Sequence, residues 1–141
     1  DFTIAAKNAY FLQAFVNIGL VPDGGASWML PRLIGKARAT EMMMLGEKIA
    51  AEKAENWGLI YKAVENETLM DEARTLATRL ANGPTVALGQ MRQNLMRALQ
   101  DDYSSSLHQE AVGQWRAGDS KDARTGIIAF LKKEKAQFTG E

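Results

Sequence analysis

The chain lacks cysteine, has a single histidine and carries no excess of either charge. Without cysteine there are no disulfides, thiolate nucleophiles or cysteine-ligated metals, and one histidine, His108, provides no histidine cluster for zinc. Because 17 basic residues balance 17 acidic ones, bulk charge attracts neither a nucleic-acid backbone nor an anionic membrane. No apolar run reaches about 18 residues, and no cationic leader precedes an apolar segment. We therefore expect a cytoplasmic protein with no metal and no nucleic-acid or membrane partner.

The amino end has the pattern of a strand that is already in progress. Residues 1–6 (DFTIAA) alternate in polarity, and residues 10–13 predict a second short strand after one polar turn. Two such short strands need further strands to form a stable sheet. The length, 141 residues, is that of one ordinary domain. We therefore expect the chain to be the later part of a longer one.

Most of the remaining sequence has a helical pattern. Apolar spacing, capping residues and terminal glycines predict helices over residues 27–34, 36–45, 51–57 and 66–80. One strand is predicted among them, over residues 59–64 (LIYKAV). The order of elements predicts an α/β protein represented by its helical half.

The carboxyl-terminal part is predicted to be entirely helical. Residues 85–118 form the longest helical pattern, and the adjacent acidic pair Asp101-Asp102 predicts a break or a bend within it. A last helix begins at a cap provided by Asp119 or Ser120 and ends near a lysine-rich tail.

Asp23 is the only charged residue between Lys7 and Arg32, within an otherwise apolar stretch. Low dielectric disfavours the charged form of a carboxyl group, and a carboxyl group that is tuned toward neutrality can take and return a proton. Pro22 and Gly24-Gly25 add little bulk, so a ligand can approach the backbone closely there. The alternative is an ordinary Pro-Asp-Gly turn, which is a common structure and the more frequent cause of this pattern.

The other candidate residues have competing structural explanations. Trp28 either forms a wall of a pocket whose acid is Asp23 or packs in the core. The three consecutive methionines 42–44 either line a pliable pocket or, more often, fill the core. His108 belongs to a polar helical pattern with no evident catalytic partner. Lys132, Lys133 and Lys135 suit the negative end of a helix dipole and, in fewer proteins, a phosphate.

Three segments of the sequence resemble the crotonase superfamily of enoyl-CoA hydratases and isomerases. The first begins with AFVNIGLVPDGGASWMLPRLIG at residues 14–35 and continues to residue 60; the others are LANGP at residues 80–84 and AFLKKEKAQF at residues 129–138. The resemblance covers essentially the whole chain, and it is greatest to isomerases of phenylacetate degradation, because LVPD is followed by small residues and tryptophan. It implies a crotonase-type (ClpP/crotonase) α/β fold, here its later half. Residues 1–80 would belong to the core domain, and residues 81–141 to a helical oligomerisation region.

The resemblance also implies roles for individual residues. One of the two glutamates of the hydratases falls at Phe15, which cannot carry a proton, whereas the aspartate of the isomerase branch falls at Asp23. Gly24 and Trp28 would contact the substrate. Two backbone N–H groups that stabilise an enolate in the family would lie before residue 1. Phe130 and Lys133 match residues of the last helix that reach coenzyme A, often in a neighbouring subunit.

The sequence therefore predicts an enoyl-CoA isomerase that shifts a double bond or a ring epoxide, with Asp23 as its acid and base. Coenzyme A would be part of the substrate, no cofactor would be bound permanently, and the protein would be a homotrimer or hexamer. An enoyl-CoA hydratase and a non-catalytic acyl-CoA-binding protein of the same fold are the alternatives. An RNA-binding relative is disfavoured by the balanced charge.

Overall fold

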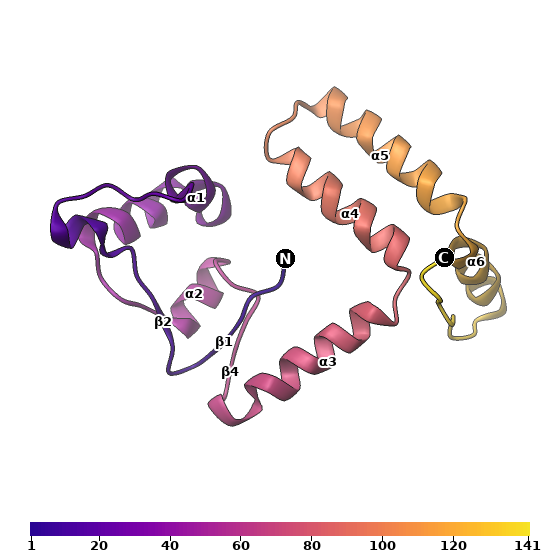
Figure 1. The fold of residues 1–141 in the computed structure, drawn as a ribbon, viewed down its shortest axis with the longest axis horizontal. Helices are drawn as coiled ribbons and strands as arrows, with labels where there is room; N and C mark the ends of the chain where they lie inside the picture. Colours follow the sequence, from indigo (N-terminus) through magenta and orange to yellow (C-terminus); the bar gives the residue numbers. More distant parts are fainter. The chain divides into compact units, whose positions relative to one another are not determined.

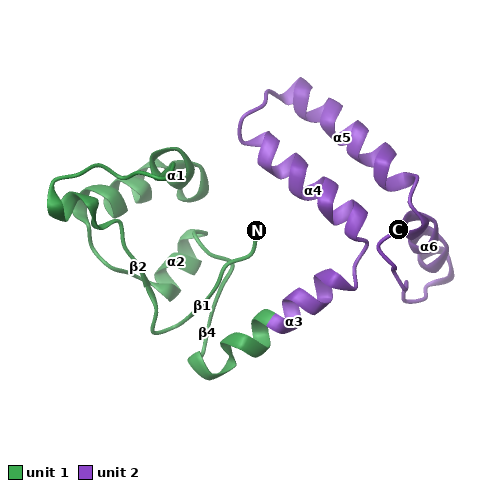
Figure 2. Ribbon diagram, viewed as in Figure 1, with its two compact units in different colours: residues 1–73 green, residues 74–141 purple.

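The computed structural model describes all residues from 1 to 141, and these fall into two compact units. The first unit comprises residues 1–73 and the second comprises residues 74–141 (Figure 2). We describe each unit by itself.

The first unit contains two pairs of very short strands. The strands β1 (Ile4–Ala6) and β4 (Lys62–Val64) pair in parallel, with Ile4 opposite Lys62. The strands β2 (Tyr10–Phe11) and β3 (Ile49–Ala50) pair antiparallel. The three predicted strands are therefore confirmed in shortened form, whereas β3 was not predicted because two residues are too few to show a periodicity.

The segment between β2 and β3 contains α1 (Ala26–Leu45), which consists of two helical segments joined at a kink (Figure 1). Gly35 interrupts it with non-helical angles, φ 77° and ψ 158°, so the two predicted helices on either side of this glycine are confirmed. A 3₁₀ helix, η1 (Ala14–Ile18), precedes α1 and was not predicted. Its polar and apolar residues show no helical period, and such short 3₁₀ turns are common as connectors.

The core of the first unit is formed by small and aliphatic side chains from both halves of α1, from the strands and from α2 (Ala51–Trp57). Ile49 is the largest apolar side chain that is almost completely buried, with 2% of its surface exposed. Ala51 and Ala54 of α2 are fully buried, so this helix packs closely against β3 and β4. Burial of this kind contributes about 25 cal/mol for each Å² of apolar surface removed from water.

The second unit is formed by helices alone. After the 3₁₀ helix η2 (Asn66–Thr68), helix α3 (Leu69–Ala81) begins in the first unit and ends in the second. Helices α4 (Thr85–Ala98) and α5 (Tyr103–Gly118) then form an antiparallel hairpin (Figure 1). The last helix is α6 (Lys121–Lys132).

The predicted interruption at the acidic pair is confirmed, because α4 ends before Asp101 and Asp102 caps α5. The Asp102 carboxylate accepts a hydrogen bond of 2.9 Å from the Ser105 N–H. Of the two predicted caps of the last helix, Ser120 is the one observed, and its hydroxyl accepts a hydrogen bond from the Ala123 N–H at 3.0 Å. Side-chain acceptors at these positions satisfy N–H groups that have no partner within the helix.

The second unit buries few side chains and exposes many large apolar ones. Its buried residues are Gly113, Asp122 and Ala129, whereas Leu95, Trp115 and Phe130 are largely exposed. Large contiguous apolar patches on protein surfaces often mark contact surfaces. No helix of the structure combines the length and the apolarity that a membrane span requires, and no cluster of three or more acidic or histidine side chains is placed to hold a metal ion.

Candidate active site

Asp23 lies in a tight turn immediately before α1. The Ala26 N–H donates to the Asp23 carbonyl at 3.0 Å, and Gly24 and Gly25 both have positive φ, 59° and 83°. A β-carbon built on either glycine would meet no atom within 4 Å. The turn therefore requires glycine for its backbone conformation, and the space beside the turn is open within this chain.

The Asp23 carboxylate is exposed and accepts no hydrogen bond from the rest of the chain. The cap position of α1 is occupied by Gly25, which provides no side-chain acceptor. Asp102 is a useful contrast, because its carboxylate caps a helix, and the Ser105 backbone N–H holds the pKa of Asp102 below its ordinary value of 3.8. The Asp23 side chain thus makes none of the bonds by which an aspartate side chain stabilises a turn or a helix end.

An apolar hollow of about 450 Å³ lies beside this turn. It is bounded by the loop that precedes Asp23 and by both halves of α1, which diverge at Gly35. Its lining includes Leu20, Val21, Pro22, Met43 and Met44. The sequence had predicted the methionines either as core or as pocket, and both descriptions apply, since Met42 is buried in the core while the next two line the hollow. The loop residues were not predicted to line it, although the apolar run before the acid is a signal for it.

Trp28 lies on the first turn of α1 and does not line this hollow. It is 37% exposed, and the Arg32 guanidinium carbon stacks 4.1 Å from the centre of its ring. Arg32 also donates a hydrogen bond to the Trp28 carbonyl at 3.0 Å. The ring is therefore held at the surface by a cation–π contact.

Phe15 is half-buried in η1, and its carbonyl accepts a hydrogen bond from the Leu20 N–H at 2.9 Å. It belongs to the segment that leads into the Asp23 turn. The 3₁₀ helix thus offers an aromatic ring, and no ionisable group, at this position.

The two remaining candidates lie at the end of α6, in the second unit. Phe130 is 82% exposed, and Lys133 is the only non-glycine residue with a positive φ, 57°. The Lys133 N–H bonds to the Phe130 carbonyl at 3.1 Å, and the Glu134 N–H to the Ala129 carbonyl at 2.9 Å. Such paired bonds terminate a helix at a left-handed residue, a position that usually belongs to glycine.

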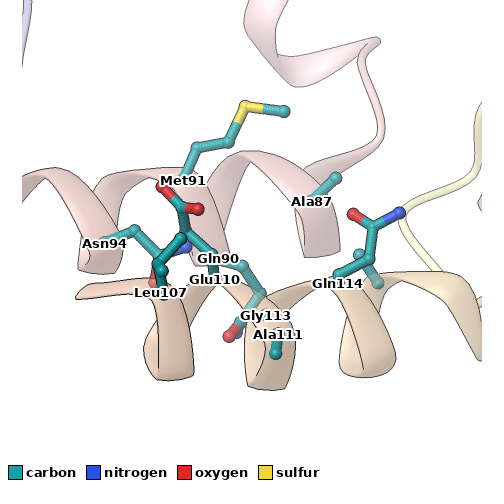
Figure 3. A pocket seen from close by; sticks show the side chains of 10 residues that line it. Ala87, Gln90, Met91, Asn94, Leu107, Glu110, Ala111, Gly113 and Gln114 are labelled. Atoms are coloured by element: carbon teal, nitrogen blue, oxygen red, sulfur yellow. The ribbon is translucent and has the colours of Figure 1, made fainter. Parts of the chain in front are cut away.

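A second hollow of about 470 Å³ is lined by residues of α4 and α5 (Figure 3). Gly113 lies at the close approach of the two helices, where an added β-carbon would be 3.2 Å from the Asn94 side-chain nitrogen. Glu110 is the only charged residue in its lining, and none of the predicted site residues contributes to it. His108 is exposed on α5 and does not line it either. We interpret this hollow as a groove of helix packing.

Two lysines, Lys7 and Lys62, have raised pKa values, and both form ion pairs with glutamates away from the candidate site residues. Hydrogen bonding to Glu65 raises the pKa of Lys7, and hydrogen bonding to Glu72 raises the pKa of Lys62. The first pair joins the residues that follow β1 and β4, and the second connects β4 to α3.

Comparison with known proteins agrees with the resemblance of the motifs. The family model described as enoyl-CoA hydratase/isomerase matches residues 1–141. The chain is 44% identical over 141 residues to 1,2-epoxyphenylacetyl-CoA isomerase of Escherichia coli K12, covering 100% of the chain and 54% of that protein. It is 42% identical over 140 residues to a protein of Rhodobacter capsulatus named probable enoyl-CoA hydratase, covering 99% and 54%.

Solved structures show the same relationship. An enoyl-CoA hydratase subunit I of Geobacillus kaustophilus superposes with a TM-score of 0.95 at 33% identity, over 100% of the chain and 55% of that structure. The chain therefore belongs to the enoyl-CoA hydratase/isomerase family, and its crotonase-type fold is confirmed. It spans about half the length of the relatives that it matches.

Proposed function

We propose that the full-length protein is an enoyl-CoA isomerase in which the Asp23 carboxylate moves a proton between two carbons of the acyl group. Asp23 removes a proton from a carbon next to the unsaturated system, and the electron pair passes into the thioester as an enolate. The same carboxyl group then returns the proton to another carbon, so the double bond shifts and the enzyme is regenerated. The enolate oxygen would be stabilised by two backbone N–H groups that the family resemblance places outside these residues.

The observation that carries this proposal is that the Asp23 carboxylate is exposed and has no partner within the chain. It is on an open glycine turn, it accepts no hydrogen bond, and an apolar hollow lies next to its turn. A structural aspartate would be expected to bond to nearby N–H groups, as Asp102 does. A group that has no structural partner is available to a substrate.

The substrate class follows from the family and from the hollow. The E. coli relative is named as an isomerase of 1,2-epoxyphenylacetyl-CoA, so enoyl-CoA thioesters and aromatic ring-epoxide thioesters are the substrates that we propose. The apolar lining of the hollow suits a hydrocarbon acyl group. Apolar walls discriminate weakly between similar acyl groups.

Contacts to coenzyme A are proposed for Phe130 and Lys133, and substrate contacts for Gly24 and Trp28. Lys133 would pair its ammonium with a phosphate of the nucleotide. Coenzyme A would arrive as part of the substrate, without a permanently bound cofactor. We also propose a homotrimer or hexamer in the cytoplasm, because the second unit exposes large apolar side chains that a partner subunit would cover.

The second candidate function is an enoyl-CoA hydratase. It is favoured by the name of the R. capsulatus relative. The hydratases of the family use two glutamates to add water, and Phe15 stands at the position of one of them. The phenyl ring cannot activate water, so we rank the isomerase first.

The test is Asp23→Asn in the full-length protein, with purified enoyl-CoA thioesters as substrates. Asparagine preserves size and polarity but cannot take the proton, so we expect kcat to fall by roughly 10²- to 10⁴-fold while KM changes little. Asp101→Asn, at an exposed position between α4 and α5, is the matched control and should retain the parent rate. A near-normal kcat for Asp23→Asn would refute the proposed role. Binding of acyl-CoA by the parent protein without any turnover would favour the non-catalytic alternative.

A further inference from the structure

After α6 the chain reverses and returns along the helix that it has just left. Residues 134–141 form this return, which we name the C-terminal strap, and the end of the chain lies beside α6 (Figure 1). The two ends of α6 are thus connected in two ways, through the helix and through the strap.

The strap is anchored on Asp122, on the first turn of α6. The Asp122 carboxylate accepts hydrogen bonds from the N–H groups of Thr139 at 2.8 Å and Gly140 at 2.9 Å. In return, the Asp122 N–H donates to the Glu141 carbonyl at 2.9 Å. Lys121 adds an ion pair with the Glu141 side chain.

Asp122 is the only charged residue of the chain that is buried, with 1% of its surface exposed. A buried carboxylate is costly unless its oxygens are hydrogen-bonded. Here each of its two oxygens receives a backbone N–H of the strap. Because these bonds are charge-assisted, they are stronger than bonds between neutral groups.

Two close approaches fix the strap further. The Phe138 ring covers Gly126 of α6, where an added β-carbon would be 3.3 Å from the ring. Gly140 has φ 81°, and a β-carbon on it would be 2.8 Å from the Thr85 hydroxyl oxygen of α4. The end of the strap therefore fits only with glycine at residue 140.

The other end of the strap begins at Lys133, the residue proposed above to contact coenzyme A. This lysine is left-handed, a conformation that the side chain of an L-residue disfavours. A conformation of this kind persists only where the surrounding structure imposes it. The strap does so, because the chain can run from the end of α6 back to Asp122 only after it has reversed at this residue.

We propose that Asp122 is a positioning residue for coenzyme A binding, and that it acts through the strap. Asp122 lies at the opposite end of α6 from Lys133, so the effect passes through the tail that it holds. Anchoring the strap keeps Lys133 in its left-handed conformation and directs its ammonium before the ligand arrives. This inference rests on the coenzyme A contact proposed for Lys133.

The test is a double-mutant cycle in the full-length protein with an acyl-CoA substrate. Asp122→Asn turns one of the two acceptor oxygens into an NH₂ group, which leaves a strap N–H without a partner. Loss of pre-organisation of one long side chain should raise KM by about three- to tenfold and leave kcat unchanged. In a Lys133→Ala background, the same substitution should have no further effect on KM.

Gly140→Ala should also release the strap from α6, and it does so without altering the Asp122 carboxylate. It should therefore raise KM to a similar extent. Unchanged KM in both variants, while a protease removes the strap faster than in the parent, would overturn the inference. Additive effects of Asp122→Asn and Lys133→Ala would overturn it as well. If Lys133→Ala alone leaves KM unchanged, the coenzyme A contact itself is wrong, and this result is distinct from a failure of the strap.

Discussion

Substitution of Gly35 by alanine tests the break that divides α1 into two segments. Gly35 has φ 77° and ψ 158°, a combination that only glycine adopts readily. A β-carbon built on Gly35 meets no atom within 4 Å, so the cost of the substitution comes from the backbone alone. Holding an L-residue in this region costs about 1–3 kcal/mol, and the reduced freedom of the unfolded chain offsets about 0.4–1 kcal/mol of that.

We therefore expect Gly35→Ala to lower the free energy of unfolding by about 1–2 kcal/mol. Gly89→Ala is the matched control, because Gly89 lies within α4, has a φ in the ordinary range and also has open space around it. There alanine should stabilise the helix by about 0.5–1 kcal/mol.

The measurement is urea unfolding of the full-length variants, followed by circular dichroism and by tryptophan fluorescence. Trp28 and Trp57 report on the first unit and Trp115 on the second. Opposite signs for the two substitutions are predicted. A stabilising effect of Gly35→Ala would mean that α1 is continuous. It would refute the kink at Gly35 and the arrangement of the two halves of α1 around the apolar hollow.

Three further predictions concern the core, a helix cap and the assembly. Ile49→Ala should lower the free energy of unfolding by about 2–5 kcal/mol, because it leaves a cavity among buried side chains; a loss below about 1 kcal/mol would contradict the core assignment. The folded-state pKa of Asp102 is lowered by the Ser105 N–H, so its contribution to stability should be present above about pH 4 and be lost as the pH falls through the folded-state value. Asp102→Asn, which keeps the cap but cannot titrate, should abolish this pH dependence, and an acid profile identical to that of the parent would refute the contribution of the carboxylate. Asp102→Ala should lower the thermal midpoint at neutral pH, and an unchanged midpoint would refute the role of the cap. Sedimentation at micromolar concentration should show a homo-oligomer, and a monomer would refute the proposed assembly.

The helix boundaries could be predicted because local chemistry determines them. Gly46 and Gly58 end helices in the left-handed conformation, and Ser120 begins one by accepting an N–H bond. These features depend on residues within one turn of each other. The strand β3 escaped prediction because its pairing with β2 depends on residues about 40 positions apart, which a local pattern does not contain.

The candidate site could be predicted only in part. The sequence shows that Asp23 is isolated in an apolar stretch. Whether its carboxylate has a hydrogen-bond partner depends on how the chain folds around it, which a local pattern does not contain. The role of Asp122 was missed for a related reason. An aspartate on the first turn of a helix is ordinary for the helix dipole, and its bonds reach Thr139 and Gly140, which are 17 and 18 residues away.

The central claim is that Asp23 moves the proton, and exchange of the substrate's acidic C–H with deuterated solvent tests it most directly. This exchange reports proton abstraction even where a later step limits turnover. The full-length parent should incorporate deuterium into the acyl group, and Asp23→Asn should do so at least about 10²-fold more slowly with unchanged substrate affinity. If Asp23→Asn exchanges that proton as fast as the parent, another group is the base and the assignment is wrong.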